Sequence, residues 1–280
     1  MKKGTMSYEM IDLAGHWWQM WRHRALNCQP VKYAYGPHPQ QYLLAFVPPG
    51  TAHLDKPLAF FFNGGAWQFG SPEMFRAQAR FFLENGFAVV LPSYRKLPGH
   101  SFLHIRADLT KLLEWTRTWM VQGGWSEPLL LLSGMSAGGH LAAHMALNTP
   151  ELTKAGLQPR HIKGMLLCGA PLDLRAMPDS LILHRLAGPR DDDLFVQANP
   201  VNLLSQETSI PILCVHGDHD GLVPLESARL FMKKVQSATA SPARFEVIIN
   251  GTHLDAGRWS YKRDAHSTLI ISWLNYGGRL

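Results

Sequence analysis

The most informative segment of the sequence is Gly134-Met135-Ser136-Ala137-Gly138-Gly139, which indicates a sharp turn between a strand and a helix. The apolar run Leu129 to Leu132 precedes it, and the Ala-rich segment His140 to Leu147 follows it. A serine between a strand and a helix needs small residues two positions before and two positions after it, because the backbone is crowded at so sharp a turn. The turn would expose the Ser136 hydroxyl at the positive end of the helix. Ser136 is therefore the candidate nucleophile.

Two polar loops follow apolar runs later in the chain. Asp220 lies in the turn after Ile212 to Val215, and His253 follows the run Phe245 to Ile249. A serine hydroxyl needs a base to remove its proton and a carboxylate to orient that base. The chain order Ser136, Asp220, His253 is the order that goes with a nucleophile on a strand-to-helix turn. We predict that these three residues form a catalytic triad.

Asp218 is an alternative to Asp220 as the carboxylate. Asp220 is favoured because it stands four residues after His216 and four before Pro224, the usual position in this turn. Either aspartate would also fit a turn residue that bonds its own backbone. The sequence leaves both open and favours Asp220.

Acyl transfer also needs hydrogen-bond donors for the oxygen that becomes negative in the tetrahedral intermediate. The apolar run Leu58 to Phe62 leads directly into Asn63-Gly64-Gly65-Ala66-Trp67. We predict an oxyanion hole made by the backbone N–H groups of Gly65 and Ala66 together with that of Ala137.

Several side chains near these loops have more than one interpretation. Trp67 and Met135 are predicted to contact substrate, although such residues beside a large core also serve as packing. His140 and His144 are four residues apart, a spacing that can bind a metal, but no third ligand is nearby. We therefore predict no metal site, and acyl transfer by a serine nucleophile requires no cofactor.

Apolar runs alternate with helical segments along most of the chain. Runs that are apolar on both faces belong in a parallel sheet covered by helices on both sides. The alternation predicts an α/β protein with a doubly wound, mostly parallel sheet, in which ligands bind beyond the carboxyl ends of the strands. The predicted strands are Tyr42 to Val47, Leu58 to Phe62, Phe87 to Leu91, Leu129 to Leu132, Met165 to Gly169, Ile212 to Val215 and Phe245 to Ile249, and the predicted helices are Pro72 to Glu84, His104 to Val121, Ala137 to Leu147, Pro224 to Val235 and Trp259 to Leu274.

The composition favours one compact domain. The 280 residues are 46% hydrophobic and 17% charged, and no repeat or linker interrupts them, so we expect a single domain over 1–280. Residues 176–201 are too irregular for the sheet and form either a small lid or a surface excursion. Residues from about 6 to 28 carry apolar side chains at helical spacing and predict an amphipathic helix packed on the body. They include Met10, Ile11, Ala14, Trp18, Trp21 and Ala25.

Charge and cysteine usage bear on partners and compartment. The net charge of +6 is spread over separated basic pairs, so no basic stripe is available for nucleic acid. The three cysteines are far apart, and Cys168 and Cys214 lie in apolar runs, which is typical of a reducing compartment. The start of the chain lacks the apolar stretch of an export signal, and no apolar run is of membrane-spanning length. We expect a cytoplasmic protein that binds a small molecule and neither nucleic acid nor membrane, while the oligomeric state is left open.

Together these stretches resemble the α/β-hydrolase superfamily, and within it the branch of kynurenine formamidases and small carboxylesterases related to the hormone-sensitive-lipase group. The similarity runs from about Tyr35 to His253 and includes Pro92-Ser93-Tyr94-Arg95, the stretch from Ala170 to Arg175, and Asn199-Pro200. The stretch from Asn63 to Ser71, with Trp67, is especially similar to the formamidase loop. That group usually has His where this chain has Asn63, and a bulky residue or Gly in place of Ala66. Asn can still brace the loop through side-chain hydrogen bonds, and Ala retains the N–H group.

The resemblance implies an α/β-hydrolase fold and a serine hydrolase that cleaves a small ester through an acyl-enzyme on Ser136. An aryl formamidase acting on a substrate like N-formylkynurenine is the alternative, and peptidase activity ranks third. A non-catalytic binding protein on the same fold is the other class of function. Such proteins usually lose a member of the triad, and this chain has a suitable residue at all three positions.

Overall fold

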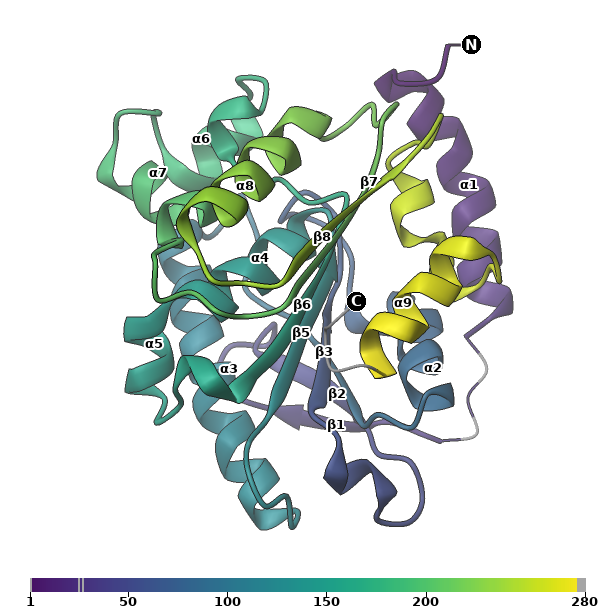
Figure 1. Cartoon of the computed structure of the whole chain (residues 1–280), viewed down its shortest axis with the longest axis vertical. Coiled ribbons are helices and arrows are strands. Elements are labelled where there is room, and N and C mark those ends of the chain that lie inside the picture. The colour runs from purple at the N-terminus through teal and green to yellow at the C-terminus, as the bar shows by residue number, and fades with distance from the viewer. Residues whose placement is uncertain (1, 25, 27, 276–280) are drawn as a thin grey trace.

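The computed structural model describes residues 2–24, 26 and 28–275, and its centre is an eight-stranded sheet in the order β1-β2-β4-β3-β5-β6-β7-β8. β2 runs antiparallel to β1 and to β4, whereas β4, β3, β5, β6, β7 and β8 are parallel to one another (Figure 1). The predicted α/β class with a mostly parallel sheet is confirmed. The strands are β1 Val31–Ala34, β2 Tyr42–Phe46, β3 Leu58–Phe62, β4 Val89–Pro92, β5 Leu130–Met135, β6 Ile162–Cys168, β7 Ile212–Gly217 and β8 Ala243–Ile248.

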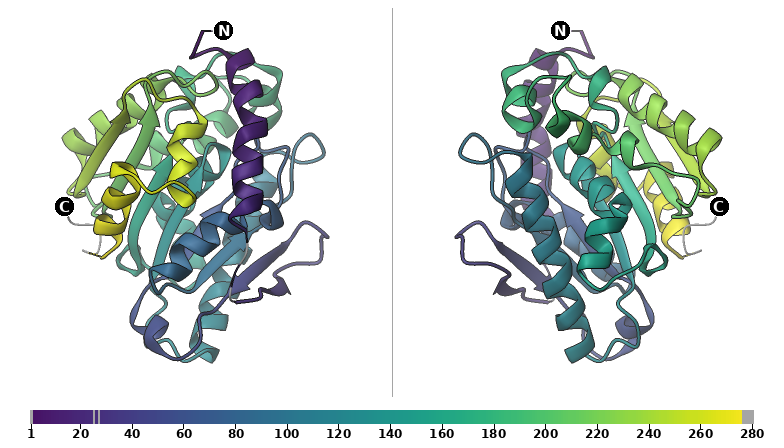
Figure 2. Two further views of the ribbon diagram at one scale, coloured as in Figure 1. Left: turned by 90° about the vertical axis from the view of Figure 1, so that its right-hand side faces the viewer. Right: turned by 90° about the vertical axis from the view of Figure 1, so that its left-hand side faces the viewer.

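Helices cover both faces of the sheet. α1, α2 and α9 lie on one face, and α3, α4 and α8 lie on the other (Figures 1 and 2). The short helices α5, α6 and α7 are on the side of α3, α4 and α8. The α-helices are α1 Met6–Arg22, α2 Arg76–Glu84, α3 Phe102–Gln122, α4 Ala137–Leu147, α5 Thr149–Lys154, α6 Leu181–Ala187, α7 Asp193–Ala198, α8 Leu225–Ala238 and α9 Ala265–Asn275.

The central strands bury both of their faces. All five residues of β3 are buried, and side chains alternate between the two sides of the sheet. Phe60 and Phe62 pack with the core under α3 and α4, whereas Phe61 packs with the core under α2 and α9. Because both faces of these strands are buried, their sequences are apolar throughout, which is the pattern that predicted a parallel sheet.

The boundaries differ from the prediction where helices begin with tighter turns. Pro72–Phe75 and Leu254–Ser260 are 3₁₀ helices, so the predicted helices 72–84 and 259–274 both begin too early. β1, α5, α6 and α7 were not predicted. These elements have between four and seven residues, too few for a periodic pattern to stand out.

α1 packs on the body through a different face from the predicted one. The apolar side chains that were expected to pack are between 51% and 67% exposed: Met10, Ile11, Trp18 and Trp21. The inner face buries Glu9, His16 and Met20 instead. Polar contacts hold this face, since the imidazole of His16 is 2.9 Å from the hydroxyl of Tyr261. α1 ends at Arg22, and Ala25 and Asn27, in the predicted helix, lie outside the described residues.

The three cysteines carry free thiols. Burial raises the pKa of the Cys168 thiol to about 12, which keeps it protonated and unreactive. Within the described ranges, no helix combines the length and the apolar character needed to cross a membrane.

Candidate active site

The turn that carries Ser136, the predicted nucleophile, lies between β5 and α4. Ser136 has φ 55° and ψ −126°, a conformation that an L-residue adopts only when the surrounding structure enforces it. A Cβ atom at Gly138 would overlap the carbonyl oxygen of Phe62, and one at Gly134 would overlap the backbone of Gly138. The small residues predicted around Ser136 are therefore required by close backbone approach. The Ser136 side chain is at a partly exposed position at the start of a buried helix.

Three strand ends meet around Ser136. Its N–H donates to the carbonyl oxygen of Cys168 at the end of β6, across 2.8 Å. Gly64, after β3, lies so close that an added Cβ would be 3.3 Å from the Cβ of Ser136. A Cβ at Gly169 would lie 3.3 Å from the imidazole ring of His253. The residue pair Cys168 and Gly169 thus brings the serine turn and the histidine loop to the same edge of the sheet.

Asp220 and His253 form a buried pair beside this turn. The Nδ1 atom of His253 is 2.7 Å from Oδ2 of Asp220, and both side chains have at most 4% exposure. The other carboxylate oxygen accepts the backbone N–H groups of Leu222 and Val223 at 2.9 and 2.8 Å. His216 places Nε2 3.2 Å from Oδ2 and 3.0 Å from the carbonyl oxygen of Val223. The carboxylate of Asp220 is therefore held from several sides.

Asp218 faces a different partner. Its carboxylate is 2.7 Å from Nδ1 of His219, and both side chains are partly exposed. Of the two aspartates left open by the sequence, the structure places Asp220 against His253.

Burial and charge act in opposite directions on the pair. Burial alone would raise the pKa of Asp220, but the charge of His253 and the hydrogen bonds from His216 and His253 lower this pKa well below its usual range. Burial alone would lower the pKa of His253, but the charge and hydrogen bond of Asp220, with a contribution from Glu9, hold this pKa above its usual value. The arrangement favours a carboxylate beside an imidazole that readily takes up a proton.

Glu9 is a residue of this region that the sequence analysis missed. It is 2% exposed, and its Oε1 atom accepts the backbone N–H groups of His253 at 2.9 Å and Gly221 at 3.0 Å. The sequence held no clear signal for it, because Glu9 and His16 interrupt the apolar pattern on the inner face of α1.

The loop after β3 passes next to Ser136 at Gly64 and contains backbone N–H groups without a protein partner. Within the part of the chain that the structure describes, the N–H groups of Gly65, Ala66 and Ala137 donate to no protein acceptor. Gly65 and Ala66 have φ of 128° and 50°. The Asn63 amide braces the loop by donating to the carbonyl oxygens of Gly64 at 2.7 Å and Phe69 at 3.4 Å, as expected for an Asn at this position.

Trp67 and Met135 lie at the site but are largely buried, with 5% and 4% exposure. The indole N–H of Trp67 donates to Nδ1 of His140 across 3.2 Å. Met135 packs against the backbone of Gly257, where an added Cβ would be 2.5 Å from its sulfur. Their contact with substrate stays a prediction.

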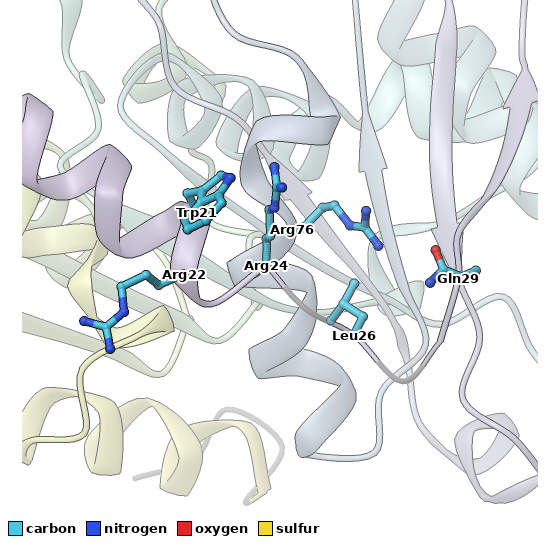
Figure 3. Close-up of a pocket in the computed structure, with 6 residues that line it drawn as sticks. All are labelled: Trp21, Arg22, Arg24, Leu26, Gln29 and Arg76. Atoms are coloured by element: carbon cyan, nitrogen blue, oxygen red, sulfur yellow. The ribbon is translucent and has the colours of Figure 1, made fainter.

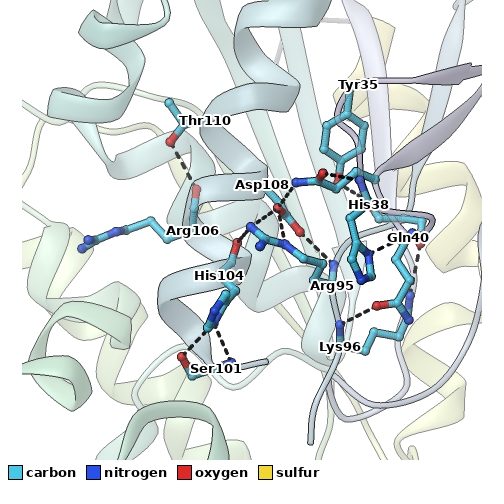
Figure 4. A network of polar contacts seen from close by, with 12 residues as sticks. Tyr35, His38, Gln40, Arg95, Lys96, Ser101, His104, Arg106, Asp108 and Thr110 are labelled. Atoms are coloured by element: carbon cyan, nitrogen blue, oxygen red, sulfur yellow. Dashed lines mark hydrogen bonds and ion pairs between the residues drawn. The ribbon is translucent and has the colours of Figure 1, made fainter. Parts of the chain in front are cut away.

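A second layer of polar contacts fixes the loop after β4 (Figure 4). Arg95 pairs with Asp108 of α3 at 2.6 Å, and the same carboxylate accepts the backbone N–H of Arg95 at 2.8 Å and the amide of Gln41 at 2.6 Å. The N–H of Leu97 then donates to the carbonyl oxygen of Trp67 at 3.1 Å. The loop after β4 therefore supports the loop after β3.

His140 and His144 connect α4 to the segment 176–201. Their Nε2 atoms are 2.8 and 3.0 Å from the carbonyl oxygens of Ala198 and Gln197. Burial lowers the pKa of His140 to about 3 and that of His144 to about 4, so both are neutral donors. Their contacts are those of structural residues, and they attach α7 to α4.

Two pockets lie away from Ser136. One, of about 480 Å³, is at the end of α1 (Figure 3) and is lined by Trp21, Arg22, Arg24, Leu26, Gln29 and Arg76. The other, of about 320 Å³, lies at the opposite end of the strands, near Lys56 and Lys163. Neither is lined by the buried pair or the nucleophile turn, so the carboxyl ends of the strands remain the candidate active site.

The chain is similar to several ester hydrolases and formamidases. It is 26% identical over 211 residues to a probable carboxylic ester hydrolase, LipM, of Mycobacterium tuberculosis, with 69% of this chain and 47% of that protein covered. It is 24% identical over 255 residues to a kynurenine formamidase of Salmo salar, with 89% and 83% covered. The chain spans about half the length of the mycobacterial relatives.

The fold is also found among solved structures. A truncated form of a carbohydrate esterase from gut microbiota superposes with a TM-score of 0.78 at 18% identity, covering 91% of this chain and 98% of the other. The fold is thus an α/β-hydrolase fold, as the resemblance implied. The BD-FAE family model matches residues 45–235, which is about two thirds of the sequence. The protein therefore belongs to the BD-FAE family.

Proposed function

We propose that the chain is a serine carboxylesterase in which Ser136 is the nucleophile, His253 the base and Asp220 the carboxylate that orients the base. The observation that carries this proposal is the buried hydrogen bond of 2.7 Å between His253 and Asp220, placed beside the strained Ser136 turn. The relatives named as ester hydrolases and esterases support it.

The proposed mechanism is two-step acyl transfer. His253 takes the proton of Ser136 while the hydroxyl oxygen attacks the acyl carbon. The N–H groups of Gly65, Ala66 and Ala137 stabilise the negative oxygen of the tetrahedral intermediate. His253 returns the proton to the leaving alcohol, and a water molecule then releases the acid by the reverse sequence. Asp220 stabilises the imidazolium that forms in both steps.

We propose a small ester as substrate, a single domain over 1–280 and a reducing, cytoplasmic setting. Ser136 is only partly exposed, which suits a small acyl group. The segment 176–201 is attached to α4 through His140 and His144, and we propose that it covers the substrate site as a small lid. The free thiols of Cys168 and Cys214 lie on neighbouring strands, which supports a reducing compartment.

An aryl formamidase is the second candidate. The Salmo salar kynurenine formamidase is covered over 83% of its length, whereas the mycobacterial relatives are covered over about half of theirs. A formamide would use the same nucleophile, base and oxyanion donors, because its cleavage is also an acyl transfer.

One kinetic experiment distinguishes the esterase from the formamidase. kcat/KM is measured for N-formyl-L-kynurenine and for a short p-nitrophenyl ester, with Ser136→Ala as the blank in both assays. A large preference for the ester supports the esterase, and a large preference for the formamide supports the alternative. Hydrolysis that persists in Ser136→Ala would refute both.

A further inference from the structure

Glu9 connects the N-terminal helix to two loops of the candidate triad. It belongs to α1, which lies outside the part of the chain that matches the family model. Its Oε1 atom accepts the N–H of His253 and that of Gly221, next to Asp220, at 2.9 and 3.0 Å. One carboxylate oxygen therefore holds both the loop of the base and the loop of its carboxylate partner.

We propose that Glu9 is a positioning residue for His253, which fixes the backbone of both loops and whose negative charge favours the imidazolium form of His253. This inference rests on the proposed function. Without Glu9, two backbone N–H groups at the buried site would lose their acceptor, at the point where the His253 ring must stay aligned with Asp220. The other carboxylate oxygen, Oε2, is buried with no hydrogen-bond partner among the described residues, so its charge is poorly screened.

The charge of Glu9 acts on the proton that the mechanism moves. The imidazolium forms when His253 takes the proton of Ser136, and a nearby negative charge stabilises that form. Glu9 is one of the groups that raise the pKa of His253, together with Asp220. Asp220 and Glu9 act on this ring directly, and its charge acts on His16 of α1. His216 shares the carboxylate of Asp220, whereas Asp255 and Arg258, from the segment after His253, act on His16. From the β6 end, Gly169 packs against the ring and carries no titratable side chain.

Asp12, on the same helix, is a suitable control for Glu9. Asp12 pairs with Arg258 at 2.5 Å, and Arg258 pairs with Asp255 at 2.6 Å. Asp12 therefore attaches the same helix to the segment after His253, but it makes no hydrogen bond to His253 or Gly221. A change at Asp12 weakens the docking of α1 without removing the two contacts of Glu9.

Three variants of the full chain separate these roles. In Glu9→Gln the amide oxygen can still accept both N–H groups, but the charge is lost. We expect lower kcat with little change in KM, and an acidic limb of the kcat/KM profile that moves to lower pH because His253 loses a neighbouring negative charge. In Glu9→Ala the acceptor is lost too, and kcat should fall by about tenfold to a hundredfold. Asp12→Asn should lower Tm while leaving the acidic limb in place.

The titration of His253, followed by NMR in wild type, Glu9→Gln and Asp12→Asn, supplies a readout that needs no substrate. The proposal is supported if the pKa of His253 is lower in Glu9→Gln than in wild type and is unchanged in Asp12→Asn. The proposal is overturned if Glu9→Gln titrates like wild type, or if Asp12→Asn produces the same shift, since docking of α1 would then explain the effect. Failure of the proposed function shows itself separately, as hydrolysis that does not depend on Ser136. If Glu9→Ala does not fold, Glu9→Gln alone decides the matter.

Discussion

The indole N–H of Trp67 donates to Nδ1 of His140 across 3.2 Å, and this bond joins the loop after β3 to α4, the helix that follows Ser136. The opposite nitrogen of the same imidazole contacts the carbonyl oxygen of Ala198 at 2.8 Å. His140 thus connects three segments: the proposed oxyanion loop, α4 and the segment 176–201. Its burial and its neutral form make it a fixed donor and acceptor.

Trp67→Phe should weaken both the fold and the reaction. The ring is retained, but Nδ1 of the buried His140 loses its partner, which costs about 1–3 kcal/mol in the free energy of unfolding. The loop is then less fixed, so kcat should fall by about tenfold with a smaller effect on KM. Denaturant unfolding and steady-state kinetics measure the two effects. Trp18→Phe, at an exposed position of α1, is the control and should change neither. Unchanged kcat in Trp67→Phe would mean that the bond does not hold the loop.

Asp220→Asn and Asp218→Asn distinguish the two aspartates. The amide of Asn at position 220 cannot orient the His253 ring in the required tautomer, so kcat should fall by about 10⁴-fold. Asp218 contacts the partly exposed His219 ring at 2.7 Å and receives backbone hydrogen bonds from Asn250 and Gly251, but it does not contact His253, so its amide variant should keep activity within about twofold. Equal losses in the two variants would contradict the proposed triad.

The pH dependence follows from the directions of the two pKa shifts. The pKa of His253 is raised mainly by Asp220, against the effect of burial, and the base works in its neutral form. kcat/KM should therefore fall on the acid side with a midpoint above the ordinary value of a free His, and Asp220→Asn should move the midpoint of the residual activity to lower pH.

Stability should respond to the same pair in two pH windows. His253 has a higher pKa in the folded protein than in the unfolded chain, so its protonation stabilises the fold. This stabilisation is fully present at pH values below the pKa of the unfolded chain, and it is lost as pH rises through the pKa of the folded protein. Asp220 has a lower pKa in the folded protein than in the unfolded chain, so its ionised form stabilises the fold. This stabilisation is present at pH values above the pKa of the unfolded chain, and it is lost as pH falls through the pKa of the folded protein. Urea unfolding across pH should show both losses in wild type, and Asp220→Asn should lack the acid one. If Asp220→Asn loses as much unfolding free energy at low pH as wild type does, that loss belongs to other carboxylates.

The turn at Ser136 and the central strands could be predicted because their signals are local. Ser136 lies between a strand and a helix that can each be recognised within a few residues, and its small neighbours are required by backbone contacts of that same turn. Asp220 and His253 could be paired because parallel strands end at one edge of the sheet. Their contact spans 33 residues, yet the topology implies it.

Glu9 and the inner face of α1 could not be predicted in the same way. The hydrogen bond from His253 to Glu9 spans 244 residues, and no sheet rule places an N-terminal helix next to a particular strand end. Hydrophobic periodicity pointed to the face of Trp18 and Trp21, which the structure leaves exposed. The helix packs instead through a face that contains two buried polar residues, Glu9 and His16, and these add nothing to an apolar pattern.

Gly169→Ala tests whether the end of β6 sets the position of the base, with Gly50→Ala as its control. Both glycines have positive φ, 53° and 80°, so an alanine at either costs about 1–2 kcal/mol of unfolding free energy. Around Gly50 nothing lies within 4 Å of the added Cβ, whereas at Gly169 the Cβ would lie 3.3 Å from two ring atoms of His253. The two variants should therefore lose similar stability, but only Gly169→Ala should lose kcat/KM, by about tenfold, because the His253 ring must shift slightly to make room for the added Cβ. Equal kinetics in the two variants at matched stability would show that His253 tolerates this displacement and that β6 does not fix its position.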